Sequence, residues 1–308
     1  MKLKRCDKNP ILKPRKGVSW ESKGVFNPGI VYNKGEVHML YRAIGEYKHY
    51  ISRCGYAWST DGVRFHRKDK PALKPELYYE KWGCEDPRIT KIDNNFYITY
   101  VVLKNPAVSP DPVVQTALAS TNDFQNFDRL GKITFKGADD KDVVLFPEMI
   151  KHNYFFLHRP NRWTGKKYET INPSIWISEV GHFNKIRKWS LLMKPKYDWE
   201  RIKIGSGTPP IKTEQGWLVI HHGIDRNNCY RAGAFLLSLN NPKKLLARSS
   251  EPILEPIKEY EREEVKKVVF PTGAYVKNRM LNVYYGASDK YVCLASCNLN
   301  KLLNSLSG

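Results

Sequence analysis

The 308-residue chain lacks any apolar run near the roughly 20 residues that a membrane-spanning helix needs. Residues 1–17 are charged and contain no apolar core, so we expect no secretory signal. The six cysteines form no Cys-x-x-Cys pair and no zinc-type spacing. Because disulfides are mainly a feature of exported proteins, we expect reduced thiols, no bound metal and a cytoplasmic protein that does not enter the membrane.

Acidic residues are also scarce, with 31 Asp and Glu against 51 Lys and Arg, which gives a net charge of +20. Such an excess can indicate nucleic-acid binding, because Lys and Arg displace counterions from phosphates. The basic residues are spread along the chain, however, and clusters such as Lys243-Lys244 are short. We interpret them as solvated faces, with a phosphorylated ligand as the next alternative, and we expect no nucleic-acid partner.

Helical periodicity is nearly absent, apart from a short stretch at 299–306, and an internal repeat stands in its place. Five segments contain a Pro that is followed two residues later by an aliphatic or small residue. These are Pro28, Pro87, Pro147, Pro209 and Pro271, with successive spacings of 59, 60, 62 and 62 residues. A polar turn and two further apolar runs follow each Pro, as expected for strands joined by hairpins. Such units bury both faces when they pack radially, so the sequence predicts an all-β, five-bladed β-propeller that occupies residues 1–308 as a single domain.

Propeller geometry predicts where the functional residues lie. The first strand of each blade lines the central channel, so equivalent positions of the five units converge on one pocket. The residue before the repeating Pro is Asn27, Asp86, Phe146, Thr208 or Phe270. Asp86 is the ionisable member of this set, and a partly desolvated carboxylic acid there would have a raised pKa and act as a general acid. The alternative is an Asp side chain that caps a turn before Pro.

Glycoside cleavage usually requires a second carboxylate, but the other units offer basic residues instead. Lys141 precedes the third Pro motif, Arg159 ends the third hairpin, and Lys203 and His222 belong to the fourth unit. Arg42 has the position in the first unit that Arg159 has in the third. Each alone fits a surface charge or a structural side chain, whereas together they describe an anion pocket, because Arg and Lys bind phosphate well. A general acid that faces a phosphate pocket indicates phosphorolysis rather than hydrolysis.

Six motifs carry a resemblance to a known family. They are GCEDPR (83–88), KDVVLFP (141–147), LHRP (157–160), KIG (203–205), GWLVIHHG (216–223) and YYGASD (284–289). In order and spacing, over nearly the whole chain, they resemble the β-mannoside phosphorylases of glycoside hydrolase family 130.

The resemblance implies an inverting, reversible reaction. Inorganic phosphate attacks a terminal β-1,2- or β-1,4-linked mannosyl unit of an oligosaccharide and releases α-D-mannose 1-phosphate. It implies that Asp86 is the catalytic acid and that its proton reaches the glycosidic oxygen through a hydroxyl of the mannose. The implied phosphate-binding residues are Lys141, Arg159, Lys203 and His222, and the implied sugar-binding residues are Asn27, Arg42, Arg88 and Asp289. Phosphate is a co-substrate, and no metal or organic cofactor is implied.

Two alternatives remain open from the sequence. One is an inverting β-mannosidase on the same fold, which would need a second carboxylate roughly 6.5–9.5 Å from Asp86 to activate water. The other is a non-catalytic propeller that binds glycans. The linkage and the formation of a homo-oligomer are also open. Loop aromatics suit either an acceptor sugar or local packing, and these are Tyr47, Tyr50, Trp163, Tyr168 and Tyr230.

Overall fold

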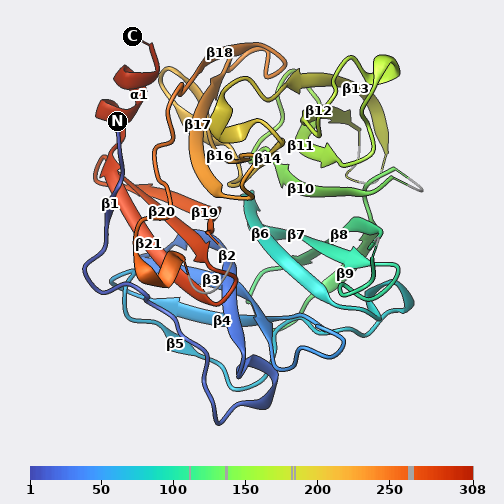
Figure 1. Ribbon diagram of the computed structural model, residues 1–308, viewed down its shortest axis with the longest axis vertical. Coiled ribbons are helices and arrows are strands. Elements are labelled where there is room, and N and C mark those ends of the chain that lie inside the picture. Colours follow the sequence, from blue (N-terminus) through green and yellow to red (C-terminus); the bar gives the residue numbers. More distant parts are fainter. Residues whose placement is uncertain (111, 136–137, 182, 184, 263–266, 308) are drawn as a thin grey trace.

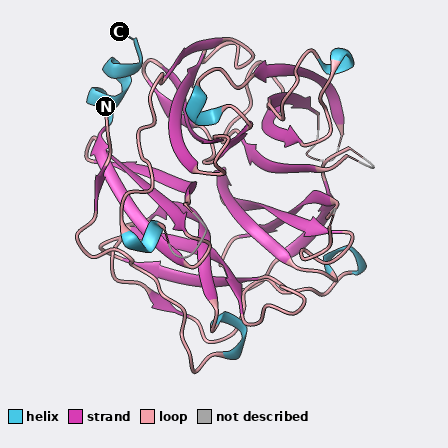
Figure 2. Cartoon of the chain, in the orientation of Figure 1, coloured by secondary structure: helices cyan, strands magenta, loops and turns pink. Residues whose placement is uncertain are grey.

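The computed structural model describes residues 1–110, 112–135, 138–181, 183, 185–262 and 267–307. Five antiparallel sheets are arranged in a ring, which confirms the five-bladed β-propeller (Figure 1). Strands dominate the chain, and the helices are short (Figure 2). Within the described residues, no helix combines the length and the apolar character required to span a bilayer.

Each blade is one sheet with its first strand nearest the centre. Blade 1 contains β2 (Gly24–Asn33), β3 (Glu36–Ile44), β4 (Arg53–Ser59) and β5 (His66–Arg67). Blade 2 contains β6 (Cys84–Ile92), β7 (Asn95–Leu103), β8 (Val114–Thr121) and β9 (Asp128–Lys132). Blade 3 contains β10 (Asp140–Leu145), β11 (Tyr154–Pro160), β12 (Ile175–Val180) and β13 (Ile186–Met193). Blade 4 contains β14 (Lys203–Ser206), β15 (Ile211–Thr213), β16 (Gly216–Ile224), β17 (Tyr230–Leu237) and β18 (Leu245–Arg248).

Blade 5 closes the ring with strands from both ends of the described chain. It contains β19 (Val269–Lys277), β20 (Met280–Ala287) and β21 (Tyr291–Asn298), and β1 (Lys4–Arg5) pairs with β21. Helix α1 (Leu299–Ser307) follows, which confirms the single helical stretch predicted near the end of the sequence. The part of the chain that the structure describes also contains short 3₁₀ helices, which are η1 (Ser19–Glu21), η2 (Tyr78–Glu80), η3 (Lys166–Tyr168), η4 (Asp198–Glu200) and η5 (Glu259–Glu261).

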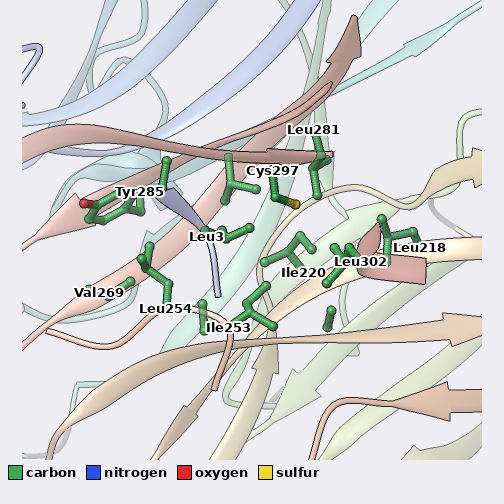
Figure 3. Packing of buried hydrophobic residues seen from close by; sticks show 14 of the residues in the cluster. Leu3, Leu218, Ile220, Ile253, Leu254, Val269, Leu281, Tyr285, Cys297 and Leu302 are labelled. Carbon is green, nitrogen blue, oxygen red and sulfur yellow. The ribbon is translucent and has the colours of Figure 1, made fainter. Parts of the chain in front are cut away.

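Turn residues and blade-to-blade packing explain why these strands form. In the turn from β2 to β3, Lys34 and Gly35 both have positive φ, as the tightest hairpin turns require. Apolar side chains of neighbouring sheets interdigitate to form the core. Figure 3 shows one such cluster, in which Leu218 and Ile220 of β16 lie near Leu281 of β20, Leu302 of α1 and the N-terminal Leu3.

The inner strands of blades 1, 2 and 3 each carry a β-bulge at the same place. Asn27, Asp86 and Asp142 occupy these bulges, and their φ values are 47°, 47° and 59°. Positive φ is uncommon outside glycine, and bulges often re-aim a side chain at a functional site. Asp142, rather than Phe146, is therefore the counterpart of Asp86, so the equivalence based on Pro147 is wrong in blade 3. Phe146 follows the end of β10 and is buried in the core. The bulge of this blade contains no Pro, so the Pro motif does not locate it.

Four of the blades each contain a buried Glu that links two strands of the sheet, a feature that the sequence analysis missed. We call each of these sets a buried brace. In each, a Glu from the 3₁₀ helix before the blade binds a Tyr or His of the second strand and an Arg of the outermost strand. The sets are Glu21–Tyr41–Arg67, Glu80–Tyr100–Arg129, Glu200–His221–Arg248 and Glu261–Tyr285–Arg5. An aromatic–Glu pair recurs in the sequence at each site: Trp20-Glu21, Tyr79-Glu80, Trp199-Glu200 and Tyr260-Glu261.

Candidate active site

A cavity of about 350 Å³ lies where the inner strands converge, and all five blades contribute to its wall. Its lining residues are Asn27, Arg42, Asp86, Lys141, Arg159, Lys203, His222, Asn228, Tyr230, Val268, Phe270 and Asp289. The structure therefore brings together eight of the nine residues that the sequence predicts for the site. The convergence follows from the fold, because equivalent positions of radially packed blades face a common axis.

Arg88 is the predicted residue that does not line the cavity. It is 1% exposed and lies behind the wall, where Nη1 donates to the backbone oxygen of Asp86 at 2.6 Å. Nε donates to the backbone oxygen of Gly207 at 3.2 Å, and Nη2 lies 3.4 Å from Asp142 Oδ1. These contacts tie blades 2, 3 and 4 together, so Arg88 positions the cavity wall, and its contact with a sugar stays a prediction.

Asp86 is held by two neighbours from blade 1. Its Oδ1 accepts hydrogen bonds from Asn27 Nδ2 at 2.8 Å and from Arg42 Nη1 at 3.1 Å. The Arg42 guanidinium also reaches Glu85, with Nη2 2.6 Å from Oε1. The αL bulge turns Asp86 into the cavity, while Glu85 is directed at Ser52 and Arg42.

The ionisation of this carboxylate pair differs from the prediction. Burial opposes the charged form of Asp86, but Arg42 and Arg88, with a smaller contribution from Lys141, outweigh it and lower the pKa of Asp86. For Glu85, burial outweighs Arg42 and raises the pKa. The raised pKa that was predicted for Asp86 is therefore wrong.

Asp142 organises the basic side of the cavity from behind. Its Oδ2 lies 2.7 Å from Arg159 Nη2 and 3.5 Å from His222 Nε2, and the carboxylate is fully buried. Burial opposes its ionisation, but the guanidinium groups of Arg159 and Arg88 outweigh that effect and hold the pKa of Asp142 well below its usual value. The sequence analysis gave Asp142 no role. The available signal was its place directly after Lys141 in the KDVVLFP motif.

Two of the predicted anion-binding groups are not permanently charged. Burial, together with repulsion from Arg159 and Lys141, lowers the pKa of Lys203 to about 7. Burial lowers the pKa of His222 well below its usual value despite the nearby Asp142, so His222 is a neutral imidazole rather than a cation. A bound anion would favour the charged forms of both groups, because an opposite charge at close range stabilises them.

Loop aromatics separate into three places. Tyr230 lines the cavity, and the ring of Tyr50 lies 5.5 Å from the Arg42 guanidinium with Tyr47 stacked beside it. Trp163 and Tyr168 stack on each other at 5.4 Å and line a separate groove on blade 3. Only the first two places are at the candidate active site.

Acidic groups at the site are limited. Among the described residues, the carboxylates that line the cavity are Asp86 and Asp289. In that same part of the chain, no group of three His, Cys, Asp or Glu side chains is arranged to hold a metal ion. The expectation that no cofactor takes part stays a prediction.

The propeller fold and a cavity that pairs one bulge-borne acid with several basic groups define a glycoside-cleaving enzyme of the phosphorylase kind. A family model described as beta-1,4-mannooligosaccharide phosphorylase matches residues 2–307. The chain belongs to this family, glycoside hydrolase family 130.

Named relatives agree with this assignment. A 1,2-beta-oligomannan phosphorylase of Thermoanaerobacter sp. (strain X514) is 39% identical over 96% of this chain and 97% of its own length. A beta-1,2-mannobiose phosphorylase of the same strain is 38% identical over 98% and 99%. The solved beta-1,2-mannobiose phosphorylase from Listeria innocua, in complex with beta-1,2-mannobiose, is 28% identical with a TM-score of 0.86 and covers 99% of both chains.

Proposed function

We propose that the protein is an inverting β-mannoside phosphorylase that removes a terminal mannosyl unit from β-1,2-linked manno-oligosaccharides and releases α-D-mannose 1-phosphate. The observation that carries the proposal is the cavity itself, in which Asp86 stands with Lys141, Arg159, Lys203 and His222. The names of the two relatives from Thermoanaerobacter support the β-1,2 linkage.

The proposed reaction is a single displacement at the anomeric carbon. An oxygen of inorganic phosphate, bound by Lys141, Arg159, Lys203 and His222, forms the new bond to that carbon while the glycosidic C–O bond breaks. The departing oxygen takes up the proton of Asp86, which passes through a mannose hydroxyl. Attack from the side opposite the leaving group converts the β-mannoside into an α-phosphate, as in other inverting glycoside cleavages. Asn27, Arg42 and Asp289 hold the sugar, and Arg88 supports them.

Phosphate would also adjust the acid. The cations that lower the pKa of Asp86 are partly neutralised when a phosphate anion binds beside them. The pKa of Asp86 then rises, so the proton donor is prepared when the nucleophile is in place. On this basis, the lowered pKa of Asp86 before phosphate binds is compatible with a role as general acid.

We further propose that the enzyme is cytoplasmic and that its 308 residues form one catalytic propeller. It would act without a metal or an organic cofactor, and it would have neither a nucleic acid nor a membrane as partner. All six cysteines are free thiols, which is typical of reducing compartments. Phosphorolysis is useful where phosphate is plentiful and where the charged sugar phosphate cannot leave the cell.

The test is turnover of β-1,2-mannobiose with and without phosphate, with ³¹P and ¹H NMR to identify the product and its anomer. We expect α-D-mannose 1-phosphate, strict dependence on phosphate, and loss of turnover in Asp86→Asn with retention of sugar binding. Free mannose at full rate without phosphate would identify a β-mannosidase instead. No turnover of any β-mannoside, despite binding, would identify a glycan-binding propeller.

A further inference from the structure

A second groove, on blade 3, shares no lining residue with the candidate active site. Its volume is about 620 Å³, against about 350 Å³ for the catalytic cavity. Four of its lining residues are aromatic, and Lys167 and Glu169 are among the polar residues that line it. The aromatic residues are Trp163, Tyr168, Trp176 and Trp189. We call it the aromatic groove.

The aromatic groove is built from a loop and two strands. Trp163 and Tyr168 come from the loop between β11 and β12, and their rings stack with an interplanar angle of 4°. Trp176 of β12 meets the Trp163 ring edge-on at 5.0 Å. Trp189 of β13 is 51% exposed, and its ring centroid lies 6.3 Å from that of Trp163.

One buried donor in the groove is unused. Trp176 is 6% exposed, and among the described residues its indole Nε1 has no hydrogen-bond partner. Buried indole N–H groups usually find an acceptor, and leaving one without an acceptor costs free energy. Because Nε1 is shielded from solvent, the groove itself presents aromatic side chains, including the half-exposed Trp189, together with the polar residues Lys167 and Glu169. A pyranose offers the matching surface, because it has an apolar C–H face and hydroxyl oxygens around its edge.

The loop that builds the groove begins at the catalytic cavity. Arg159 lines the cavity, and Trp163 lies four residues further along the same chain segment. Even a fully extended chain spans at most about 14 Å over four residues. One lining residue of each pocket therefore lies within about 14 Å of the other along the backbone, a separation that an oligosaccharide of several sugar units spans.

We propose that the aromatic groove is a distal subsite that binds the sugar units of the acceptor end of a long manno-oligosaccharide. This inference rests on the proposed function. The groove would give long substrates an additional contact and would leave the chemistry at Asp86 unchanged. A groove of this size is within the range of pockets that bind small ligands.

The test compares β-1,2-mannobiose with β-1,2-mannopentaose in the unmodified enzyme and in Trp189→Ala. We expect the variant to raise KM for mannopentaose about five- to tenfold, from the usual contribution of one aromatic contact. KM and kcat for mannobiose should be unchanged. Trp189→Tyr should restore most of the affinity for the long substrate. Tyr78→Ala is the matched control, because Tyr78 is 84% exposed and lines neither cavity.

Several results would overturn the distal subsite. Equal changes in KM for the two chain lengths, or no change for either, would remove the groove from substrate binding. A Trp189→Ala variant that dissociates an oligomer in sedimentation velocity would assign the face to a second copy of this chain. If the unmodified protein fails to turn over mannobiose, the proposed function fails. In that case, binding at the aromatic groove is measured separately by the quenching of tryptophan fluorescence with mannopentaose. The quenching should be lost in Trp189→Ala if the groove binds the sugar.

Discussion

At the scale of single residues, the cavity keeps several groups in protonation states that phosphate would change. Lys203 has a pKa of about 7 because it is buried beside Arg159 and Lys141. Protonation of Lys203 and binding of an anion should therefore favour each other near neutral pH. Asp142 limits the repulsion by pairing with Arg159 from behind the wall. The cavity thus contains several hydrogen-bond donors, and in the proposed reaction inorganic phosphate would supply acceptors for them.

The pH dependence of phosphate binding tests this arrangement. A pKa lowered to about 7 means that the charged form of Lys203 prevails below this pH and is lost above it. We expect the KM for phosphate to rise as the pH increases from 7 to 9, with little change in the KM for the mannoside. Lys203→Arg keeps its charge over this range, because the guanidinium pKa exceeds 12, and should flatten the profile. Lys203→Met should bind phosphate weakly at every pH. Identical profiles for the unmodified enzyme and Lys203→Arg would contradict the assignment.

At the scale of strands and turns, the sequence predicts the repeat well and the position of one bulge poorly. The 59–62-residue spacing of Pro motifs identifies five blades, because a radial fold needs equivalent turns at equivalent places. It also brings Asp86 and the basic residues to one cavity. Pro147 misleads, since the bulge of blade 3 lies at Asp142 and depends on backbone pairing rather than on a residue type. Ionisation states could not be predicted either, because they depend on the distances between buried charges.

Glu80 provides a test of the buried braces. Its carboxylate accepts from Tyr100 Oη at 2.6 Å and from Arg129 Nε at 2.9 Å. Glu80→Ala would leave Arg129 partly unpaired inside the blade and should lower the free energy of unfolding by about 3–5 kcal/mol. Glu76→Ala is the control, because Glu76 contacts the same Arg129 from a 53% exposed position. That change should cost less than about 1 kcal/mol in urea unfolding.

The pH dependence adds a second criterion for this brace. Hydrogen bonds and Arg129 outweigh burial and lower the pKa of Glu80. The ionised brace therefore contributes its full stability above the unfolded Glu pKa of about 4.3 and loses it as the pH falls through the folded value. The difference in stability between the unmodified protein and Glu80→Ala should shrink under acid. Equal effects of Glu80→Ala and Glu76→Ala would show that the brace adds no more than a surface pair.

At the scale of the whole molecule, the ring is completed by a strand from the start of the chain. Arg5 of β1 donates to Glu261 at 2.8 Å, and Leu3 N donates to Ile253 O at 2.9 Å. Leu3 also packs within the cluster between blades 4 and 5 (Figure 3). The cavity depends on this closure, because Asn27 of blade 1 faces Asp289 and Gly286 of blade 5 across the last joint.

Deletion of residues 1–5 should therefore affect both stability and the sugar side of the cavity. Loss of the buried Arg5–Glu261 pair alone removes about 3 kcal/mol, which corresponds to a fall in Tm of about 5 °C for a chain of this length. Well below the new Tm, the KM for the mannoside should rise, since Asn27 and Asp289 lie at the weakened joint. The KM for phosphate should change less, because Lys141, Arg159 and Lys203 belong to blades 3 and 4. Lys2→Ala, which breaks only an exposed pair with Glu255, is the control. A lowered Tm with an unchanged KM for the mannoside would show that the closing strand stabilises the ring without shaping the cavity.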